Sequence, residues 1–257
     1  MRDKKRYTFE DLIKVMEELR NKCPWDREQT HESLKKYLIE EAYEVLDAID
    51  SKDDEKLKEE LGDLLLQVVF HSQIARERGA FDINEVIDTL VKKLIERHPH
   101  VFGNEKPEDV LKNWEKKKME KRKSIFEGIP KHLPALMRSQ KLQDRASQVG
   151  FDFENINQVF EKIQEEINEL KESLEKNDKE NIKHEIGDIL TAVVELARFV
   201  NVDAEEALQE ANDRFIRRFS YIEKKAKEMG KKLEDMSLEE MDKLWLEAKA
   251  LEGEKGG

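Results

Sequence analysis

The chain has 257 residues, and its 47 basic and 59 acidic side chains give it a formal net charge of −12. We find no strongly basic block that offsets this charge locally, so non-specific binding to nucleic acid is not expected. A single cysteine, no apolar leader and no stretch of membrane-spanning length predict a cytoplasmic protein without an intramolecular disulfide. With only 10 glycines and 5 prolines, and with abundant Glu, Lys and Leu, the composition predicts an all-α protein.

The first helix is expected to begin after Thr8, which forms a capping signal with Asp11. The segment 23–30 that follows it lacks helical periodicity and contains Pro24, so we expect an ordered loop there. Trp25 in this loop either contacts a ligand or fills the edge of the core, and the sequence leaves both readings open.

Two longer helices are expected over residues 33–50 and 55–78. The polar connection between them is short, which makes the two helices antiparallel neighbours. Apart from its acidic residues, the second helix is apolar almost all round, as is typical of a buried helix. Gly62 in its middle costs about 1 kcal/mol relative to alanine. The recurrence of this glycine as Gly187 indicates a close approach between helices.

Each of these two helices carries acidic residues spaced three apart, Glu41 with Glu44 and Glu60 with Asp63. Residues at this spacing share a helix face, so the antiparallel arrangement brings the four carboxylates together. Ionised carboxylates are rarely buried without a partner, because removing them from water is costly. The set offers oxygen ligands only, which favours Mg²⁺ or Mn²⁺ over Zn²⁺.

A fourth helix is expected to begin at the capping pair of Asp82 and Glu85 and to end before a proline. Lys93 and Arg97 lie four residues apart on it and therefore share a face. A strongly basic helix that carries Trp114 follows. A linker is then expected over residues 124–134, where glycine and proline interrupt the pattern.

The second half of the chain repeats the first. The four acidic residues recur 125 positions later as Glu166, Glu169, Glu185 and Asp188. A single acidic pair is usually a solvated helix face, but two copies in register favour a metal site. Later in the second half, at an offset of 121, Arg214 and Arg218 match the first half's pair of cations, and Trp245 matches its tryptophan. We therefore expect two tandem helical-bundle domains, residues 1–123 and 124–257, related by an internal repeat.

Carboxylates around Mg²⁺, together with a nearby pair of cations, are the parts needed to hold a polyphosphate. Lys93 and Arg97 could grip its phosphates, and an adjacent carboxylate could take a proton from water, for which Glu40 and Glu165 are the candidates. Trp114 and Trp245 could stack on a nucleobase, although packing in the core is an equally common role for tryptophan. The chain has no phosphate-binding GxxxxGK[ST] loop and no apparent Ser-His or Cys-His constellation.

The pattern of EExxE, fifteen further residues and ExxD, present at 40–63 and again at 165–188, resembles the MazG nucleoside triphosphate pyrophosphohydrolases. The stretches Cys23–His31, Arg97–Phe102 and Leu133–Arg138 resemble the two-domain bacterial members of this family. The resemblance implies an all-α homodimer that hydrolyses nucleoside and deoxynucleoside triphosphates to the monophosphate and pyrophosphate with Mg²⁺. It also implies a broad base range and a role in cleaning the nucleotide pool, with metal-activated water attacking the α-phosphorus.

Carried over by position, the resemblance makes all eight repeated acidic residues metal ligands: Glu41, Glu44, Glu60, Asp63, Glu166, Glu169, Glu185 and Asp188. It makes Arg214, Arg218 and Trp245 nucleotide contacts, with Lys93, Arg97 and Trp114 as their counterparts in the first half. The family pattern often has a lysine four residues before the ExxD glutamate, as Lys56 is here. The second half has Asn181 at that place, and Lys179 or Lys183 could substitute for the lysine.

Two alternatives remain open at the level of sequence. One is a relative with narrow specificity, for dUTP, dCTP or phosphoribosyl-ATP. The other is a helical interaction module whose acidic clusters bind a basic partner and need no metal. Metal-dependent binding of a nucleotide distinguishes the module from the enzymes, and a panel of triphosphates distinguishes the enzymes from one another.

Overall fold

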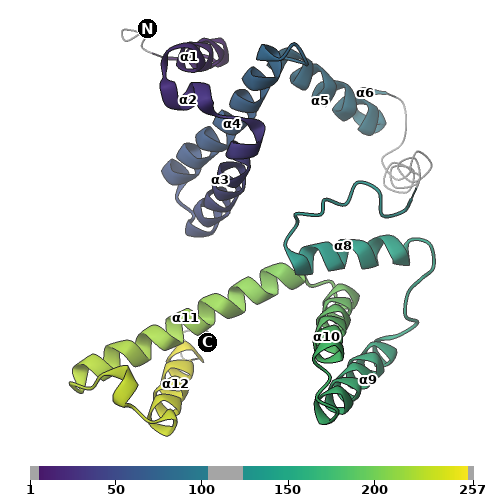
Figure 1. The fold of residues 1–257 in the computed structure, drawn as a ribbon, viewed down its shortest axis with the longest axis vertical. Helices are drawn as coiled ribbons and strands as arrows, with labels where there is room; N and C mark the ends of the chain where they lie inside the picture. Colours follow the sequence, from purple (N-terminus) through teal and green to yellow (C-terminus); the bar gives the residue numbers. More distant parts are fainter. Residues whose placement is uncertain (1–5, 104–123, 254–257) are drawn as a thin grey trace. The chain divides into compact units, whose positions relative to one another are not determined.

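The computed structural model describes residues 6–103 and 124–253. Within these ranges every regular element is a helix, as predicted, and the chain divides into two compact units, Met1–Lys118 and Met119–Gly257 (Figure 1). The division falls between the two described ranges, so a domain boundary after residue 123 stays a prediction. Trp114 also lies outside the described residues. No helix in the described part of the chain is long and apolar enough to cross a membrane.

Unit 1 is built around a pair of long helices. Its elements are α1 (Phe9–Lys22), α2 (Pro24–Glu28), α3 (His31–Ser51), α4 (Asp54–Glu77), α5 (Ile83–Arg97) and α6 (Pro99–Phe102). Helices α3 and α4 pack against each other, α1 packs on α4 and on α2, and α5 contacts α4 and α6. The turn between α3 and α4 is short, as the polar connection predicted.

The predicted caps form. Thr8 and Asp11 exchange hydrogen bonds in a capping box, and Asp82 does the same with Glu85. The prediction of a loop over residues 23–30 is only partly correct, because α2 within it is a short helix, and a second short helix, α6, follows the fourth predicted helix. Both begin with proline, whose fixed φ suits the first helical position and whose missing N–H would have no partner there.

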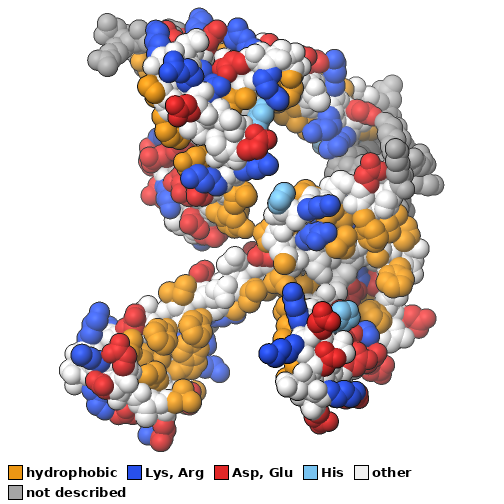
Figure 2. All heavy atoms as spheres, viewed as in Figure 1, with side chains coloured by type: hydrophobic (Ala, Val, Ile, Leu, Met, Phe, Trp, Pro, Cys, Tyr) orange, Lys and Arg blue, Asp and Glu red, His pale blue; other side chains and the backbone are white. Residues whose placement is uncertain are grey.

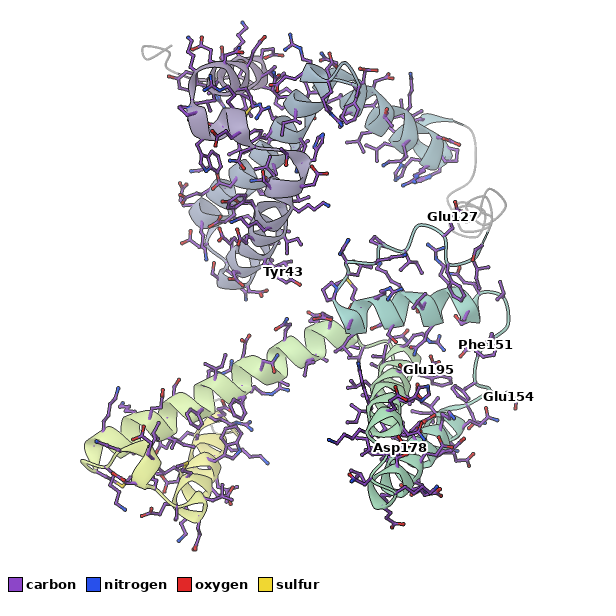
Figure 3. The ribbon with its side chains drawn as sticks, in the orientation of Figure 1. Tyr43, Glu127, Phe151, Glu154, Asp178 and Glu195 are labelled. Atoms are coloured by element: carbon purple, nitrogen blue, oxygen red, sulfur yellow. The ribbon has the colours of Figure 1, made fainter. Side chains whose placement is uncertain are left out.

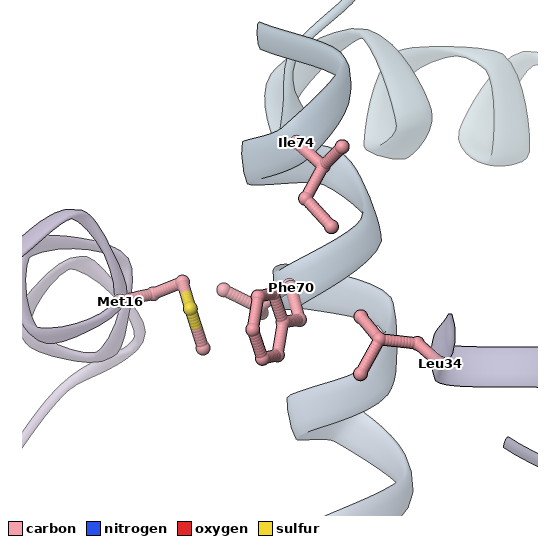
Figure 4. Packing of buried hydrophobic residues seen from close by; sticks show 5 residues of the cluster. Met16, Leu34, Phe70 and Ile74 are labelled. Carbon is pink, nitrogen blue, oxygen red and sulfur yellow. The ribbon is translucent and has the colours of Figure 1, made fainter. Parts of the chain in front are cut away.

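The core of unit 1 lies where α1, α3 and α4 meet. Its buried members are Met16, Leu34, Val69, Phe70 and Ile74 (Figure 4). Because these residues come from three helices, their burial fixes the α3 and α4 pair against α1.

Arg20 fastens α2 to this core. Its side chain is only 9% exposed, and its guanidinium lies 5.7 Å from the centre of the Phe70 ring. It donates a bidentate pair of hydrogen bonds to Glu77 and further bonds to the backbone carbonyls of Asp26 and Gln29. A buried cation with this many acceptors is fully satisfied, so it can tie the short α2 segment to α1 and α4.

Two histidines link the start of α3 to α4. Arg78 donates to Nε2 of His31 at 3.1 Å, so that nitrogen carries no proton, and Nδ1–H of His31 donates to Nδ1 of His71 at 2.8 Å. The proton of His71 is then on Nε2, which is buried without a hydrogen-bond partner. The two rings are stacked, with centroids 5.1 Å apart.

Unit 2 repeats the long helix pair. Its elements are α8 (Ala135–Ser147), α9 (Ile156–Glu175), α10 (Lys179–Phe199), α11 (Ala204–Glu228), the 3₁₀ helix η1 (Leu233–Asp235) and α12 (Leu238–Gly253). Helix α9 packs on α10, α8 packs on α10 and α11, and α12 folds back on α11 (Figure 1). A second cluster of buried side chains, Ile222, Ala226, Met236 and Leu244, joins the far end of α11 to α12.

The acidic half of α4 is less buried than its apolar sequence predicted. Leu61 is 49% exposed and Leu65 is 40% exposed in the single chain, whereas Val69 and Phe70 further along are buried. Hydrophobic side chains also reach the surface elsewhere, between the charged ones (Figure 2). The prediction of a close helix approach at Gly62 and Gly187 is wrong for the single chain, because a Cβ at either position would meet no atom within 4 Å.

Candidate functional site

In unit 1 the antiparallel helices α3 and α4 bring the predicted acidic residues together. Glu41 of α3 and Glu60 and Asp63 of α4 each place a carboxylate oxygen within 4.8 Å of the others. Glu44, one turn further along α3, lies close enough to Glu60 to raise the pKa of that carboxyl. Four carboxylates therefore meet at one place, as the spacing of three predicted.

The cluster disfavours its own negative charge. Burial raises the pKa of Glu41, and the charges of Asp63, Glu44 and Glu60 raise it further. The pKa of Glu60 is raised too, first by loss of solvent and then by Glu44. Like charges held this close need a cation or protons between them.

Unit 2 forms the corresponding cluster between α9 and α10. Oxygens of Glu166, Glu169 and Glu185 lie within 4.8 Å of one another, and Asp188 lies within the same distance of Glu185. Loss of solvent raises the pKa of Glu185, and Glu169 adds to the effect. Oε2 of Glu185 is buried and has no hydrogen-bond partner. A buried carboxylate oxygen without a donor, among other carboxylates, fits a hard cation such as Mg²⁺.

The two clusters differ in the cations beside them. In unit 2, Lys162 lies 2.7 Å from Glu166 and 3.1 Å from Glu165, and His184 lies 2.8 Å from Asp188. Glu166 is the main reason that the pKa of Lys162 is raised. The positions 125 residues earlier are Tyr37 and Glu59, so unit 1 has neither of these partners. The two units therefore share the four acidic residues, but the basic partners Lys162 and His184 occur in unit 2 alone.

The carboxylates proposed as proton acceptors lie beside the clusters. Glu40 and Glu165 are both exposed, one position before the first metal ligand of each half. Glu40 is close enough for its charge to raise the pKa of Glu41. Glu165 instead pairs with Lys162. This contact was not predicted from the sequence, although Lys162 lies three residues before Glu165 and four before Glu166, the spacings at which helical side chains meet.

The structure brings together only some of the predicted phosphate and base contacts. Lys56 of α4 is near enough to Glu60 to lower its pKa, opposing the neighbouring acids. Lys183 lies on α10, two positions before Glu185. Lys93 and Arg97 lie on α5, which packs on α4 and α6. Trp25, on α2, is 52% exposed and meets Tyr37 edge to face, so it does not plug the core.

Arg218 and Trp245 come together on α11 and α12, apart from the pair of helices that carries the acidic cluster of unit 2. The guanidinium of Arg218 lies 5.5 Å from the Trp245 ring centre, and it also pairs with Glu252 at 2.8 Å. Arg214 pairs with Glu210 at 3.4 Å. Trp245 packs against the buried cluster of α11 and α12, which is the packing role that the sequence left open beside stacking.

Comparisons with known proteins agree with the repeat. The family model "MazG nucleotide pyrophosphohydrolase domain" matches residues 29–102 and again 154–222. The chain is 50% identical over 247 residues to the "Nucleoside triphosphate pyrophosphohydrolase/pyrophosphatase MazG" of Thermotoga maritima, covering 94% of this chain and 95% of that protein.

Two further relatives have different overall lengths. The "Nucleoside triphosphate pyrophosphohydrolase" of Escherichia coli K12 is 43% identical over 254 residues, covering 94% of this chain and 97% of that protein. A protein of Bacillus subtilis, YabN, is 50% identical over 256 residues, but this match covers only 52% of its length. With the family model matched in both halves and these identities over nearly the whole chain, the chain belongs to the MazG nucleotide pyrophosphohydrolase family.

Proposed function

We propose that this chain hydrolyses nucleoside and deoxynucleoside triphosphates to the monophosphate and pyrophosphate in a reaction that requires Mg²⁺, with Mn²⁺ as a substitute. The observation that carries the proposal is the convergence of four carboxylates in each unit, with Oε2 of Glu185 buried and unpartnered. Relatives that match nearly the whole chain are named for this activity.

The carboxylates would hold the metal through oxygen ligands. In unit 1 these are Glu41, Glu44, Glu60 and Asp63, and in unit 2 they are Glu166, Glu169, Glu185 and Asp188. When bound, Mg²⁺ would neutralise phosphate oxygens and lower the pKa of a water molecule. Loss of solvent, and then repulsion by the neighbouring carboxylates, raises the pKa values of Glu41 and Glu185, so a cation there would also offset the protein's own negative charge.

The remaining side chains would orient the substrate and move the proton. Water attacks the α-phosphorus, a new P–O bond forms, and the bond from the α-phosphorus to the bridging oxygen breaks to release pyrophosphate. Glu40 or Glu165 takes the proton of the water. Cations grip the phosphates, and the candidates are Lys56, Lys93, Arg97, Lys183, Arg214 and Arg218. Trp25, Trp114 and Trp245 are candidates for contact with the nucleoside.

We also propose that the active form is a homodimer in the cytoplasm. Leu61 and Leu65 lie on the exposed side of α4, and Ile186 and Leu190 lie exposed on its counterpart α10. Apolar side chains exposed along paired helices need cover, which a second copy would supply. Light scattering at micromolar concentration tests this, and a monomer would contradict it.

The reaction is tested with a panel of nucleoside and deoxynucleoside triphosphates, with released pyrophosphate as the readout. In water enriched in heavy oxygen, the label should appear in the monophosphate, because the α-phosphorus is attacked. Label in orthophosphate would mean hydrolysis of the γ-phosphate and would contradict the proposal. Activity with one base alone would restrict it to a narrow relative of the family.

A further inference from the structure

Unit 1 contains a cavity that lies apart from its acidic cluster. It has a volume of about 220 Å³ and lies where α1, the later part of α4 and the start of α5 meet. Figure 3 shows the side chains of these three helices. Gln73, which lines the cavity, follows Asp63 by ten residues on α4, which is about 15 Å along the helix axis. The cavity is therefore a separate place from the carboxylates.

Gln73 offers a hydrogen-bond acceptor to this cavity. The residue is only 8% exposed, and its Nε2 donates to Oε1 of Glu77 at 3.2 Å, which fixes the orientation of the amide. No described residue donates to Oε1 of Gln73, and this atom, unlike Oε1 of Gln67, is not sealed from solvent. Because the side chain is otherwise buried and lines the cavity, its free oxygen opens into the cavity.

Ser72 is the second buried polar side chain in the lining, and it is 4% exposed. Its hydroxyl donates to the backbone carbonyl of Val68 at 2.8 Å, so the lone pairs of Oγ remain to accept. Ser72 and Gln73 have thus both engaged a donor within α4. The wall formed by α4 therefore suits a ligand that carries N–H groups.

The start of α5 supplies a donor on the other side of the cavity. Asp82 caps this helix and accepts from the backbone N–H groups of Asn84 and Glu85. The N–H of Ile83, the first helical residue, donates to no described residue. Ile83 is 7% exposed and lines the cavity. A buried backbone N–H without an acceptor is rare, so a partner for this group is expected.

Unit 2 shows which chemical group fits this corner of the fold. The first residue of α11 is Ala204, which follows a capping aspartate as Ile83 does. Its N–H donates to Oε1 of Gln140 on α8 at 2.9 Å, and Nε2 of Gln140 donates to the backbone carbonyl of Val202 at 3.1 Å. A primary carboxamide of the chain itself therefore satisfies the helix start in unit 2. In unit 1, α1 lines the cavity with Ile13 instead.

The charged groups that line the cavity already have partners. The guanidinium of Arg76 lies 3.5 Å from the carboxylate of Glu17. The carboxylate of Asp82 is occupied by the N–H groups of the helix start and by the side-chain amide of Asn84. A neutral ligand would leave both of these charges with their partners.

We propose that this cavity of unit 1 binds a small neutral molecule that carries a primary carboxamide on an apolar body. The carbonyl oxygen of the ligand accepts from the N–H of Ile83, and its NH₂ group donates to Oε1 of Gln73 and Oγ of Ser72. The apolar body packs against Ile13 and Val69. A carboxylate of the same shape has no N–H for these acceptors, and a site built for hydrogen bonds rejects such an analogue strongly.

The test measures the dissociation constant of benzamide with the full chain by ligand-observed NMR, with benzoate as the analogue that lacks the N–H groups. The wild-type chain should bind benzamide about tenfold more tightly than benzoate or better. Gln73→Leu should weaken benzamide binding about tenfold, because an N–H of the ligand loses its acceptor. Gln67→Leu makes the same substitution at a buried position of α4 that does not line the cavity, so this matched control should bind benzamide as the wild-type chain does.

A second pair of variants tests the backbone donor. Ile83→Pro removes the N–H, and α5 should still form because proline is favoured at the first helical position and Asp82 before it is already extended. Ile83→Val keeps the N–H while it shortens the side chain. Benzamide should bind the valine variant about as it binds the wild-type chain, and the proline variant about tenfold more weakly.

Several outcomes would overturn the inference. If the wild-type chain binds no benzamide at millimolar concentration, the cavity holds only water. Equal affinities for benzamide and benzoate would remove the role of the N–H groups, and full affinity in both Gln73→Leu and Ile83→Pro would place the ligand elsewhere. Because Gln73→Leu also removes the bond to Glu77, the pair of Ile83 variants decides the question if that variant unfolds. The acidic clusters play no part in this binding, so its outcome is independent of whether the chain releases pyrophosphate.

Discussion

At the scale of single residues, the acidic clusters should bind metal in competition with protons. The pKa values of Glu41, Glu60 and Glu185 are raised above the ordinary value, so these groups hold protons at a pH where a free glutamate is ionised. A cation must displace those protons, and its affinity should therefore rise with pH over the range in which they titrate. Titration of the chain with Mn²⁺ at several pH values between about 5 and 8 measures this dependence.

A control is available on α9. Glu172 is exposed and pairs with Lys176, outside the acidic cluster, so Glu172→Gln should leave both the affinity and its pH dependence unchanged. Glu185→Gln should weaken binding in unit 2. An affinity for metal that is independent of pH in the wild-type chain would contradict the assignment of these carboxylates as ligands.

The pair of His31 and His71 should make unit 1 sensitive to acid. Burial and the neighbouring His31 lower the pKa of His71 below its unfolded value, and Glu32 opposes this only in part. The unfolded chain therefore binds more protons than the folded chain as the pH falls. The stability that the neutral pair contributes is complete above about pH 6.5 and is lost below it. A proton on either ring would also disrupt the chain of donors from Arg78.

The second copy supplies the comparison variant for this prediction. The positions equivalent to His31 and His71 are Ile156 and Leu196, so the chain itself shows an apolar pair that suits the same fold. Urea unfolding at about pH 7.5 and about pH 5.5 should show a smaller loss of stability in the double variant His31→Ile, His71→Leu than in the wild-type chain. Equal losses in both proteins would mean that the pair does not sense pH.

At the scale of elements, Arg20 is the contact on which the arrangement of α1, α2 and α4 most depends. Arg20→Ala removes a buried guanidinium and its hydrogen bonds to Glu77 and to the backbone carbonyls of Asp26 and Gln29. Gln73 remains as a donor to Glu77, and the Gln29 N–H remains as a donor to Asp26. Removing one member of a buried pair typically costs about 3–5 kcal/mol, and we expect about 2–3 kcal/mol here because Glu77 is partly exposed. Lys22→Ala, which breaks a fully exposed pair with Glu18 on the same helix, should cost less than about 0.5 kcal/mol. Chemical unfolding of both variants compares the two, and equal losses would contradict the role of Arg20.

The elements themselves could largely be predicted from the sequence, because their signals are local. The capping residues Thr8 and Asp82 and the periodic apolar residues fix where helices begin and which face they bury. The spacing of three between Glu41 and Glu44 is by itself enough to put both carboxylates on one face of a helix.

What could not be predicted depends on contacts between elements. The pairing of Lys162 with Glu166 and the partner that Arg218 finds in Glu252 follow from how side chains meet in three dimensions. The pocket between α8, α10 and the loop that joins α8 to α9 was also missed, because Glu195 and the other residues that line it come from segments far apart in the sequence. The internal repeat shows which residues of the two halves correspond. Only the structure shows which differences between corresponding residues change the contacts that a side chain makes.

For the whole molecule, the central question is whether both copies work. Each unit gathers its own four carboxylates, so Glu44→Gln and Glu169→Gln should each disable one half with little effect on folding. Removing one ligand weakens the metal and misplaces the water, and neutralising one acid in a repulsive cluster does not harm the folded state. Turnover of each single variant and of the double variant measures the contributions of the two halves. If Glu44→Gln leaves turnover unchanged and Glu169→Gln abolishes it, unit 1 is not catalytic.

The exchange of Phe70 in unit 1 for Glu195, 125 residues later in unit 2, also bears on how such a chain can change over generations. Phe70 belongs to a tightly packed core, so substitutions there are selected against through folding whatever the substrate. Position 195, in the other copy, lines a pocket between α8, α10 and the loop that joins α8 to α9, so a different side chain there changes the lining of the pocket and leaves that core in place. In a single domain this one position would have to serve both the packing of the core and the lining of a pocket. With two copies, each requirement falls on a different residue. The side chain at this position can therefore change in the second copy while the first preserves a stable scaffold.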